Sequence, residues 1–537
     1  FAEAAWRGGI AVPPPSVRGT PAPPAPAPQV RNLGMAAAEP LTAPELKVYV
    51  GGARQAKLPG DESEREVQPV VFTVENPPGG PSCRAPADIA IAIDISGSMG
   101  TAATIKSADG LEQNNGLTFL DIAKHAMKTV IATLGEEDRL AIVAFDHIAR
   151  DTLHLTKMDA AGRENAVRKV EELRECGGTV IWEGLKMAMD MLVEGKADAG
   201  GRLGHVMLLT DGQTQYRERL VPNLEEYAAK SVGEQLPGSL STFGFGYNID
   251  SEILVMMSDF GGGAYSFIPD PGMVGTVCIN TLANILATCA SEVVVTASFE
   301  RDWEVLEVLG SLKYSKKVEE GETTVRVTLG SMQFGQSRNA VIMTVPPGSA
   351  KEVVANIQYT PSGQKEMQES KDPAVEMSDT KSPPEKIELQ LFRCELIETL
   401  RDNVARCKDQ SYVTQAHEKM RKFGEKIKSS DLAGHEYLVA MGEDVCGQSL
   451  EAFSRSDWYM KWGRHYIPSI MFAHRMQQCN NFKDPSVQLY TSEMFKGLQE
   501  LADDAFNTLP APQPRARPTY GGGYGGGYGG GGGVVGG

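Results

Sequence analysis

Apolar and polar positions follow two patterns along the chain. The first pattern, short apolar runs that alternate with helical spacing, covers residues 86–289. Four short runs there are almost wholly apolar, as strands buried on both faces of a sheet are: 88–93, 139–145, 205–209 and 242–246. Between them, apolar residues recur at helical spacing, for example over 123–134 and 181–192. Strands that alternate with helices predict an α/β domain with a doubly wound, mostly parallel sheet.

The second pattern covers residues 290–360. It consists of strand-like segments separated by turns, without helical spacing. It predicts a small antiparallel β-sandwich associated with the α/β domain. The segments LKVYVG and VQPVVFTVE, within residues 46–85, have the same character. We expect them to join the sandwich, so that the α/β domain would be inserted into it.

Helical spacing returns after a polar linker predicted at 361–386. One apolar stripe is formed by Leu389, Phe392, Leu396, Leu400 and Val404. Further helices are predicted at 412–427, 445–453, 457–478 and 489–506. The sequence therefore predicts a helical C-terminal region over 387–510.

The two ends differ from everything between them. Residues 1–45 are rich in Pro and Ala, and residues 511–537 are rich in Gly and Tyr. Such compositions bury too little apolar surface to offset the entropy of ordering. We therefore expect a disordered leader and a disordered tail.

Composition narrows the classes of function. The chain has 537 residues, with 52 Lys and Arg against 69 Asp and Glu, and a net charge of −17. This balance argues against nucleic-acid binding, which needs a concentrated basic face. No apolar run reaches the roughly 18 residues of a membrane span. The 8 cysteines are scattered without a CxxC pair, which argues against a zinc site. They favour buried thiols in a reducing, cytoplasmic location, although their even number also allows disulfides. A targeting signal or another module could precede Phe1.

Oxygen-bearing side chains follow the predicted strands. Asp94 ends the first strand and is followed by Ser96 and Ser98, whereas Asp211 follows the run 205–210. Thr179 comes after two glycines, just before a helix. Ligands of open parallel sheets bind beyond the carboxyl ends of the strands, so we expect these three loops to meet there.

The five side chains offer two carboxylates and three hydroxyls, and no nitrogen or sulfur. This donor set predicts a site for Mg²⁺, with Mn²⁺ or Ca²⁺ as alternatives. Two carboxylates leave a divalent ion incompletely neutralised when they act through water. An Asp or Glu side chain of a protein partner is therefore expected to complete the coordination.

Three motifs carry a resemblance: DISGS from Asp94, Gly-Gly-Thr ending at Thr179, and Thr-Asp-Gly around Asp211. Together they resemble the metal-ion-dependent adhesion site of the von Willebrand factor A domain. The resemblance implies six helices around the sheet, direct ligation by Ser96, Ser98 and Thr179, and aspartates that act mainly through water. Residues 101–116 are longer than the usual link and could form a lid beside the metal. Each motif alone also fits an ordinary turn, and only their joint order favours the metal site.

Enzyme classes find little support in the sequence. A haloacid-dehalogenase-type phosphatase would need an aspartate where Ser96 stands, and neither the G-x-S-x-G elbow nor a P-loop is present. His205 lies in a strand and Glu183 on a helix, so neither is a convincing general base. We predict that the chain is not an enzyme.

The segment 461–490, KWGRHY…QQCNNFKDPSVQLY, resembles the tail of a eukaryotic family in which an A domain precedes an intein-like (Vwaint-type) region. We interpret His465, His474 and Cys479 within it as structural.

The expected function is a metal-dependent protein-interaction scaffold. Two alternatives stay open. One is the substrate-recognition part of a ubiquitin ligase, as some plant relatives carry a RING that is absent here. The other is an extracellular adhesion or matrix protein resembling the inter-alpha-trypsin inhibitor heavy chains.

Overall fold

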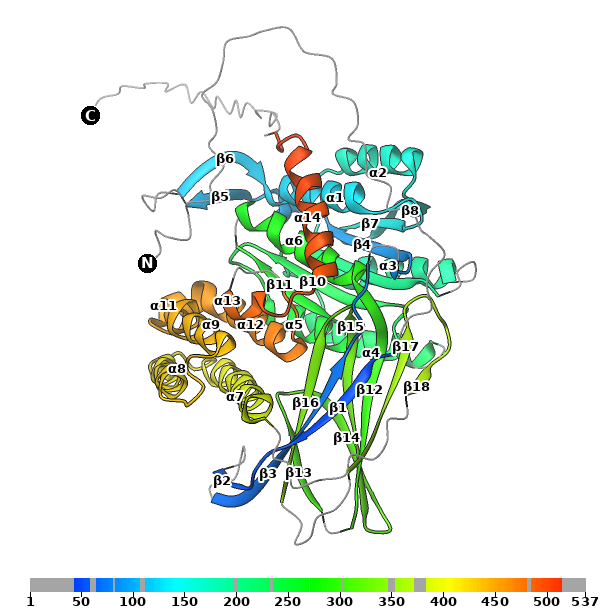
Figure 1. Cartoon of the computed structure of the whole chain (residues 1–537). Helices are drawn as coiled ribbons and strands as arrows, with labels where there is room; N and C mark the ends of the chain where they lie inside the picture. Colours follow the sequence, from blue (N-terminus) through cyan, green and yellow to red (C-terminus); the bar gives the residue numbers. More distant parts are fainter. Residues whose placement is uncertain are drawn as a thin grey trace, which may run out of the picture.

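The fold was derived from a computed structural model of the chain. It describes residues 43–57, 64–80, 83–106, 112–196, 201–231, 235–269, 271–301, 303–345, 353–370, 383–480 and 484–513. Nearly all of the predicted leader 1–45 and tail 511–537 lies outside these ranges, as does most of the second half of the predicted linker 361–386. Three parts pack together: an α/β part, two antiparallel sheets that extend below it in Figure 1, and C-terminal helices beside both.

The α/β part is built on a six-stranded sheet. Its strands, in spatial order, are β11 (Gly262–Ile268), β10 (Ser239–Phe245), β9 (Leu203–Thr210), β4 (Ala87–Asp94), β7 (Arg139–Phe145) and β8 (Ala149–Lys157). All neighbours are parallel except β7 and β8. Every residue of β4 is buried, because helices cover both faces. The predicted doubly wound, mostly parallel sheet is confirmed.

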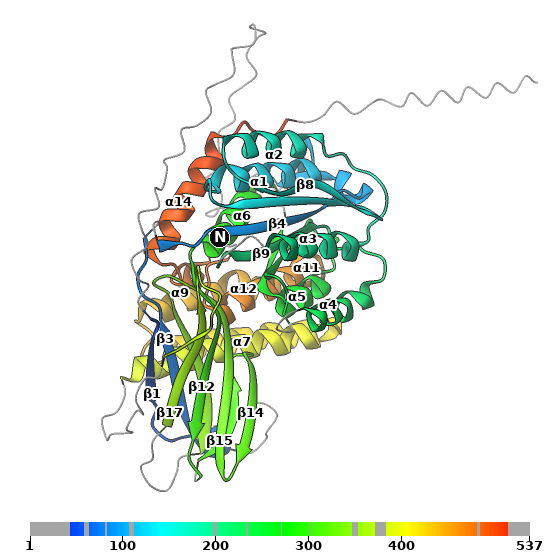
Figure 2. The same cartoon turned by 90° about the vertical axis from the view of Figure 1, so that its right-hand side faces the viewer.

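Six α-helices cover this sheet in the described part of the chain. One face carries α1 (Phe119–Thr133), α2 (Ala160–Glu172) and α6 (Pro271–Leu286). The other carries α3 (Ile181–Lys196), α4 (Leu220–Lys230) and α5 (Ser251–Phe260), as Figure 2 shows. A capping box between Thr118 and Asp121 starts α1, because each side chain satisfies a backbone N–H that the helix leaves free.

Two antiparallel sheets form the second part. The first has the order β1 (Glu45–Val50), β3 (Glu64–Glu75), β16 (Ser337–Val345) and β13 (Glu304–Leu309), with β2 (Arg54–Lys57) on β3. The second has the order β14 (Lys313–Glu319), β15 (Glu322–Gln333), β12 (Thr288–Phe299), β17 (Val353–Pro361) and β18 (Gln368–Ser370). The Phe72 and Phe299 rings meet edge-on between the sheets, with centroids 6.4 Å apart. Since β3 pairs with β16, the α/β part lies in sequence between two paired strands.

The third part is helical. It contains α7 (Pro384–Arg406), α8 (Val413–Lys428), α9 (Glu436–Asp444), α10 (Leu450–Ala452), α11 (Ser456–Trp458), α12 (Arg464–Met476), α13 (Pro485–Gln488) and α14 (Glu493–Thr508). The predicted helices over 445–453 and 457–478 are interrupted by the π-helical turns Val445–Ser449 and Tyr459–Gly463. No helix in the described ranges combines the length and apolarity needed to cross a bilayer.

The helical part is attached to the α/β part at two places. A hydrogen bond of 2.8 Å joins Nδ1 of His465 in α12 to Oγ of Ser251 in α5. Helix α14 returns to α1 and α6 (Figure 1), where the Phe506 ring packs edge-on against His125 with centroids 4.7 Å apart. The C-terminal helices therefore hold the α/β part on two of its sides.

The long segment after the first motif is a hairpin. Strands β5 (Ala102–Lys106) and β6 (Glu112–Thr118) pair antiparallel and project away from the sheet (Figure 1). They start directly after a 3-10 turn, Gly97–Gly100. That this segment acts as a lid stays a prediction.

Candidate metal centre

Asp94 is the last residue of β4, and its side chain is completely buried. The Ser96 backbone N–H donates to Asp94 Oδ1 at 2.8 Å, and the Thr210 hydroxyl donates to Oδ2 at 2.6 Å. Thr210 is the last residue of the neighbouring strand β9. The two bonds fix the carboxylate between the ends of two adjacent parallel strands.

The two serines join the β4 loop to the β9 loop. Ser96 Oγ and Ser98 Oγ are 3.0 Å apart, and the Ser98 hydroxyl also bonds Asp211. Asp211 is 6% exposed, and its Oδ1 accepts the backbone N–H of Gln213 at 3.3 Å. Four of the predicted site residues are therefore connected, directly or through Thr210.

The loop that carries Thr179 lies against both other loops. The Cys176 N–H donates to the Ile95 carbonyl at 2.7 Å, and the Gly97 N–H donates to the Gly177 carbonyl at 3.1 Å. The Thr179 carbonyl accepts the Gln215 N–H at 3.1 Å. The Thr179 hydroxyl makes no hydrogen bond with any described residue. The structure thus brings all three sequence-predicted loops to one edge of the sheet.

The electrostatics of this edge are unbalanced. Burial raises the pKa of Asp94 to about 7, although hydrogen bonds from Ser96 and Thr210 act in the opposite direction, and nearby Asp211 adds to the rise. Burial also raises the pKa of Asp211. No Lys or Arg among the described residues forms an ion pair with either carboxylate. A bound cation would supply the missing positive charge.

The residues present fit a hard divalent cation. The donor atoms of Asp94, Ser96, Ser98, Thr179 and Asp211 are all oxygens, which Mg²⁺ and Ca²⁺ prefer. Within the described ranges, no group of three or more His, Cys, Asp or Glu side chains is arranged to hold a metal ion. A site here would depend on two carboxylates together with neutral hydroxyls, and the metal assignment stays a prediction.

Asp146 is a residue of this edge that the sequence reasoning missed. It directly follows β7, and its carboxylate accepts bonds from Arg150 Nη2 (2.9 Å), the Ile148 N–H (2.9 Å) and Cys176 Sγ (3.1 Å). Burial alone would raise the pKa of Asp146, but these bonds outweigh it and hold the pKa well below its usual range. Its position after the apolar run 139–145 is the same signal that marked Asp94.

Asp146 also explains a glycine in the Thr179 loop. Gly177 has a φ of +70°, and a Cβ there would lie 2.7 Å from Asp146 Oδ2. Both the backbone conformation and the lack of space favour glycine. Asp146 is thus a positioning residue for the loop rather than a candidate ligand.

The other chemical candidates are structural, as interpreted from sequence. His205 of β9 bonds Ser239 Oγ at 2.6 Å, and burial lowers the pKa of its ring to about 3. His465 and His474 are completely buried, and burial lowers the pKa of each to about 3. Cys479 is 1% exposed. The described structure shows no catalytic site at these positions.

This fold and this edge define a class of protein. The family described as von Willebrand factor type A domain matches residues 89–213. Domains of this type are generally protein-interaction modules rather than enzymes. The family described as VWA / Hh protein intein-like, Vwaint, matches residues 435–504. The chain therefore contains a von Willebrand factor type A domain and, in its C-terminal helices, a Vwaint segment.

Relatives and a solved structure agree with this assignment. An uncharacterized protein of Synechocystis sp. is 29% identical over 188 residues, 35% of this chain and 39% of that protein. The E3 ubiquitin-protein ligase WAV3 of Arabidopsis thaliana is 33% identical over 164 residues, 28% and 20% of the two chains. The inter-alpha-trypsin inhibitor heavy chain H2 of Mus musculus is 28% identical over 183 residues, 32% and 17% of the two chains. The match thus spans well under half the length of each relative.

The solved structure of a von Willebrand factor type A protein from Catenulispora acidiphila covers 75% of this chain and 90% of its own, with a TM-score of 0.52. At 19% identity it supports the fold alone. Because the relatives include Synechocystis sp., the expected restriction of the family to eukaryotes is not supported.

Proposed function

We propose that this protein is an interaction scaffold whose A domain binds an Asp or Glu side chain of a protein partner through a divalent cation, with Mg²⁺ as the favoured ion. The observation that carries the proposal is the pair of buried carboxylates, Asp94 and Asp211, which have no cationic partner among the described residues. Ser96 and Ser98 lie on the loop that follows Asp94, and Thr179 lies on the loop before α3.

Each part of the site has a separate task in this proposal. Ser96, Ser98 and Thr179 would hold the ion directly, and the two aspartates would act through water. The ion would supply a positively charged coordination position that a carboxylate of the partner completes. The backbone bonds between the Gly97 and Gly177 loops hold the donors in place without the ion, so little ordering is needed when it binds.

Calorimetric titration with Mg²⁺ tests the ion. We expect saturable binding by the wild type and its loss in Asp94→Ala and Asp211→Ala, each with an unchanged circular dichroism spectrum. Glu164→Gln, an exposed carboxylate of α2, is the matched control and should bind as the wild type does. Wild-type binding by both aspartate variants would refute the assignment of the site.

A pull-down with and without EDTA then tests the partner. A partner captured in Mg²⁺ and lost in EDTA supports the proposal, provided that replacing one of its acidic side chains by an amide also abolishes capture. Capture that is independent of both changes would contradict it.

The relative named as a ubiquitin ligase favours a second candidate, in which this chain recognises the substrates of a ligase. Full-length transcript sequence upstream of Phe1 tests it, because a RING module there would supply the catalytic partner.

The relative named as an inhibitor heavy chain raises the extracellular alternative. All 8 cysteines are free in the structure, so a thiol titration that finds them reduced in the native protein would favour the proposed cytoplasmic location.

A further inference from the structure

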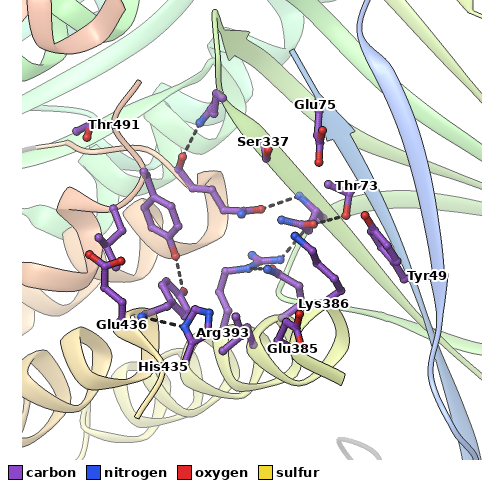
Figure 3. A pocket seen from close by; sticks show the side chains of 18 of the residues that line it. Tyr49, Thr73, Glu75, Ser337, Glu385, Lys386, Arg393, His435, Glu436 and Thr491 are labelled. Atoms are coloured by element: carbon purple, nitrogen blue, oxygen red, sulfur yellow. Dashed lines mark hydrogen bonds between the residues drawn. The ribbon is translucent and has the colours of Figure 1, made fainter. Parts of the chain in front are cut away.

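A cavity of about 420 Å³ lies between the first antiparallel sheet and the C-terminal helices, far in sequence from the candidate metal centre. Figure 3 shows its walls, with Tyr49 and Thr73 from β1 and β3 on one side and residues of α7 and α9 below. Arg393 of α7 lines the cavity and is only 1% exposed. The cavity therefore has a charged group buried in its wall.

The guanidinium of Arg393 is bonded to neutral oxygens only. Its Nε donates to Gln390 Oε1 at 2.8 Å, Nη1 to the His474 carbonyl at 3.1 Å and Nη2 to the Asn339 carbonyl at 3.0 Å. No carboxylate of the described residues pairs with it. A guanidinium carries five N–H donors, so two remain beyond these three bonds. Burying a charge without an opposite charge is costly, which makes the wall receptive to an anion.

A second buried arginine adds to the positive charge. Arg338 is completely buried and donates to the Leu329 and Ser331 carbonyls and to Gln336 Oε1, whereas its Nε has no partner. Burial, together with the nearby charge of Arg393, lowers the pKa of Arg338 to about 9. The Arg338 guanidinium is therefore charged at neutral pH.

Two helices begin at this cavity. Lys386 lies in the first turn of α7, and His435 is the N-cap of α9; both line the cavity. The positive ends of both helix dipoles thus add to the charge of Arg393. Lys386 forms no ion pair with any described residue. Of the acidic side chains in the lining, Glu75 is paired with Lys47 at 2.5 Å.

We propose that this cavity binds a small organic carboxylate, whose carboxylate is bonded by Arg393 and whose apolar part packs against Tyr49, Leu389 and Leu489. The planar guanidinium fork matches a carboxylate in two-point geometry. The three apolar side chains line the same cavity, so the site suits an amphipathic acid better than an inorganic ion. This proposal does not depend on the metal site.

Calorimetry of the full chain in EDTA tests the class of ligand, because EDTA removes divalent ions that could bind carboxylates elsewhere. The probes are benzoate, its uncharged isostere benzamide and inorganic phosphate. We expect saturable 1:1 binding of benzoate and binding of benzamide that is at least about tenfold weaker. No saturation by benzoate, equal binding of benzamide, or tighter binding of phosphate would each overturn the proposal.

Two variants at the mouth locate the site without disturbing the core, and a third changes the buried Arg393 itself. Lys386→Gln should weaken benzoate binding about threefold, and Glu436→Gln, which removes an exposed negative charge from the lining, should strengthen it by a similar factor. Lys428→Gln, an exposed lysine at the end of α8, is the matched control. Arg393→Lys keeps the charge and should lose about tenfold in affinity through the lost fork. Benzoate affinity that is unchanged in all three cavity variants would place the binding elsewhere and refute the proposal.

Discussion

Two regions of this molecule bury charge without an opposite charge among the described residues, and they do so with opposite signs. At the edge of the six-stranded sheet, Asp94 and Asp211 are buried next to hydroxyls. Beside the first antiparallel sheet, Arg338 and Arg393 are buried next to carbonyls. Neutral groups hold the charged group in position in both places: they donate hydrogen bonds to the carboxylates and accept them from the guanidinium groups. A ligand of opposite charge would complete the balance.

The comparison teaches that the two signs of charge are not equivalent. A buried carboxylate can lose its charge by accepting a proton, and burial favours this at Asp94 by raising its pKa to about 7. A guanidinium cannot be discharged near neutral pH, so its only relief is a hydrogen-bonded anion or a polar cage. The charge at the sheet edge should therefore change with pH. The charge of the cavity lined by Arg393, called the arginine cavity below, should not.

The largest expected effect is at the sheet edge. Asp94→Ala should weaken Mg²⁺ binding at least about a thousandfold, roughly 4 kcal/mol, because it removes one of two buried negative charges. Competition against a fluorescent Mg²⁺ chelator measures the change beyond the range of direct calorimetry. A loss of less than tenfold would mean that the edge does not bind the ion through this carboxylate.

A buried acid away from both sites sharpens the comparison. Burial raises the pKa of Asp484 to about 7, with Asp444 adding to the rise, so the folded protein binds a proton more tightly than the unfolded chain. The contribution of Asp484 to stability is therefore fully present below about pH 4 and is lost as the pH rises to about 7. Asp484→Asn should remove this loss, so the difference in free energy of unfolding between the variant and the wild type should be about 4 kcal/mol more favourable to the variant at pH 8 than at pH 4. Thermal unfolding of both proteins across this range measures it; parallel pH profiles would contradict the expectation.

The arginine cavity should depend on geometry as well as charge. Arg393→Lys should lower the free energy of unfolding by about 2 kcal/mol, because an ammonium cannot reach the Asn339 and His474 carbonyls in the same fork. Urea denaturation measures the change, with Lys428→Gln as the control. The loss should be the same at pH 6 and pH 8, and a strong pH dependence would break the contrast between the two regions.

The smallest effect concerns a residue that does not touch the proposed ion. Asp146→Asn should weaken Mg²⁺ binding about tenfold, roughly 1.4 kcal/mol, by loosening the Gly177 loop without removing a donor. Calorimetry measures the affinity, and a normal heat of binding per ion would show that the ligands are intact. An unchanged affinity would show that the loop is held without this carboxylate.

How far the sequence could predict the fold depended on burial. Strands buried on both faces, such as β4 and β9, are continuous apolar runs and were predicted. Strand β14 was not, because all of its residues are exposed and show no apolar pattern; it is held by its pairing with β15. Strands β8 and β11 were also missed, since they are the two outermost strands of the six-stranded sheet.

The candidate site divides in the same way. Asp94, Ser96, Ser98, Thr179 and Asp211 could be predicted because each follows a recognisable apolar run or a glycine pair. Asp146 carries the same signal but belongs to no motif, so it was missed. Arg393 has no signal at all, since an arginine in a helix is normally exposed. It is buried because α7 packs against the first sheet and α12 at once.

The sequence by itself determined the class of fold, a mostly parallel sheet, and the loops that meet beyond its strand ends, because apolar periodicity and strand ends are local properties of the chain. The number of helices around the sheet was expected only from the resemblance to the A domain. Only the tertiary structure decided that α14 returns to α1 and α6, that Asp146 positions the Gly177 loop, and that two arginines are buried near each other. These depend on contacts between residues far apart in the chain, where the energy of a buried charge is set by neighbours that no local pattern records.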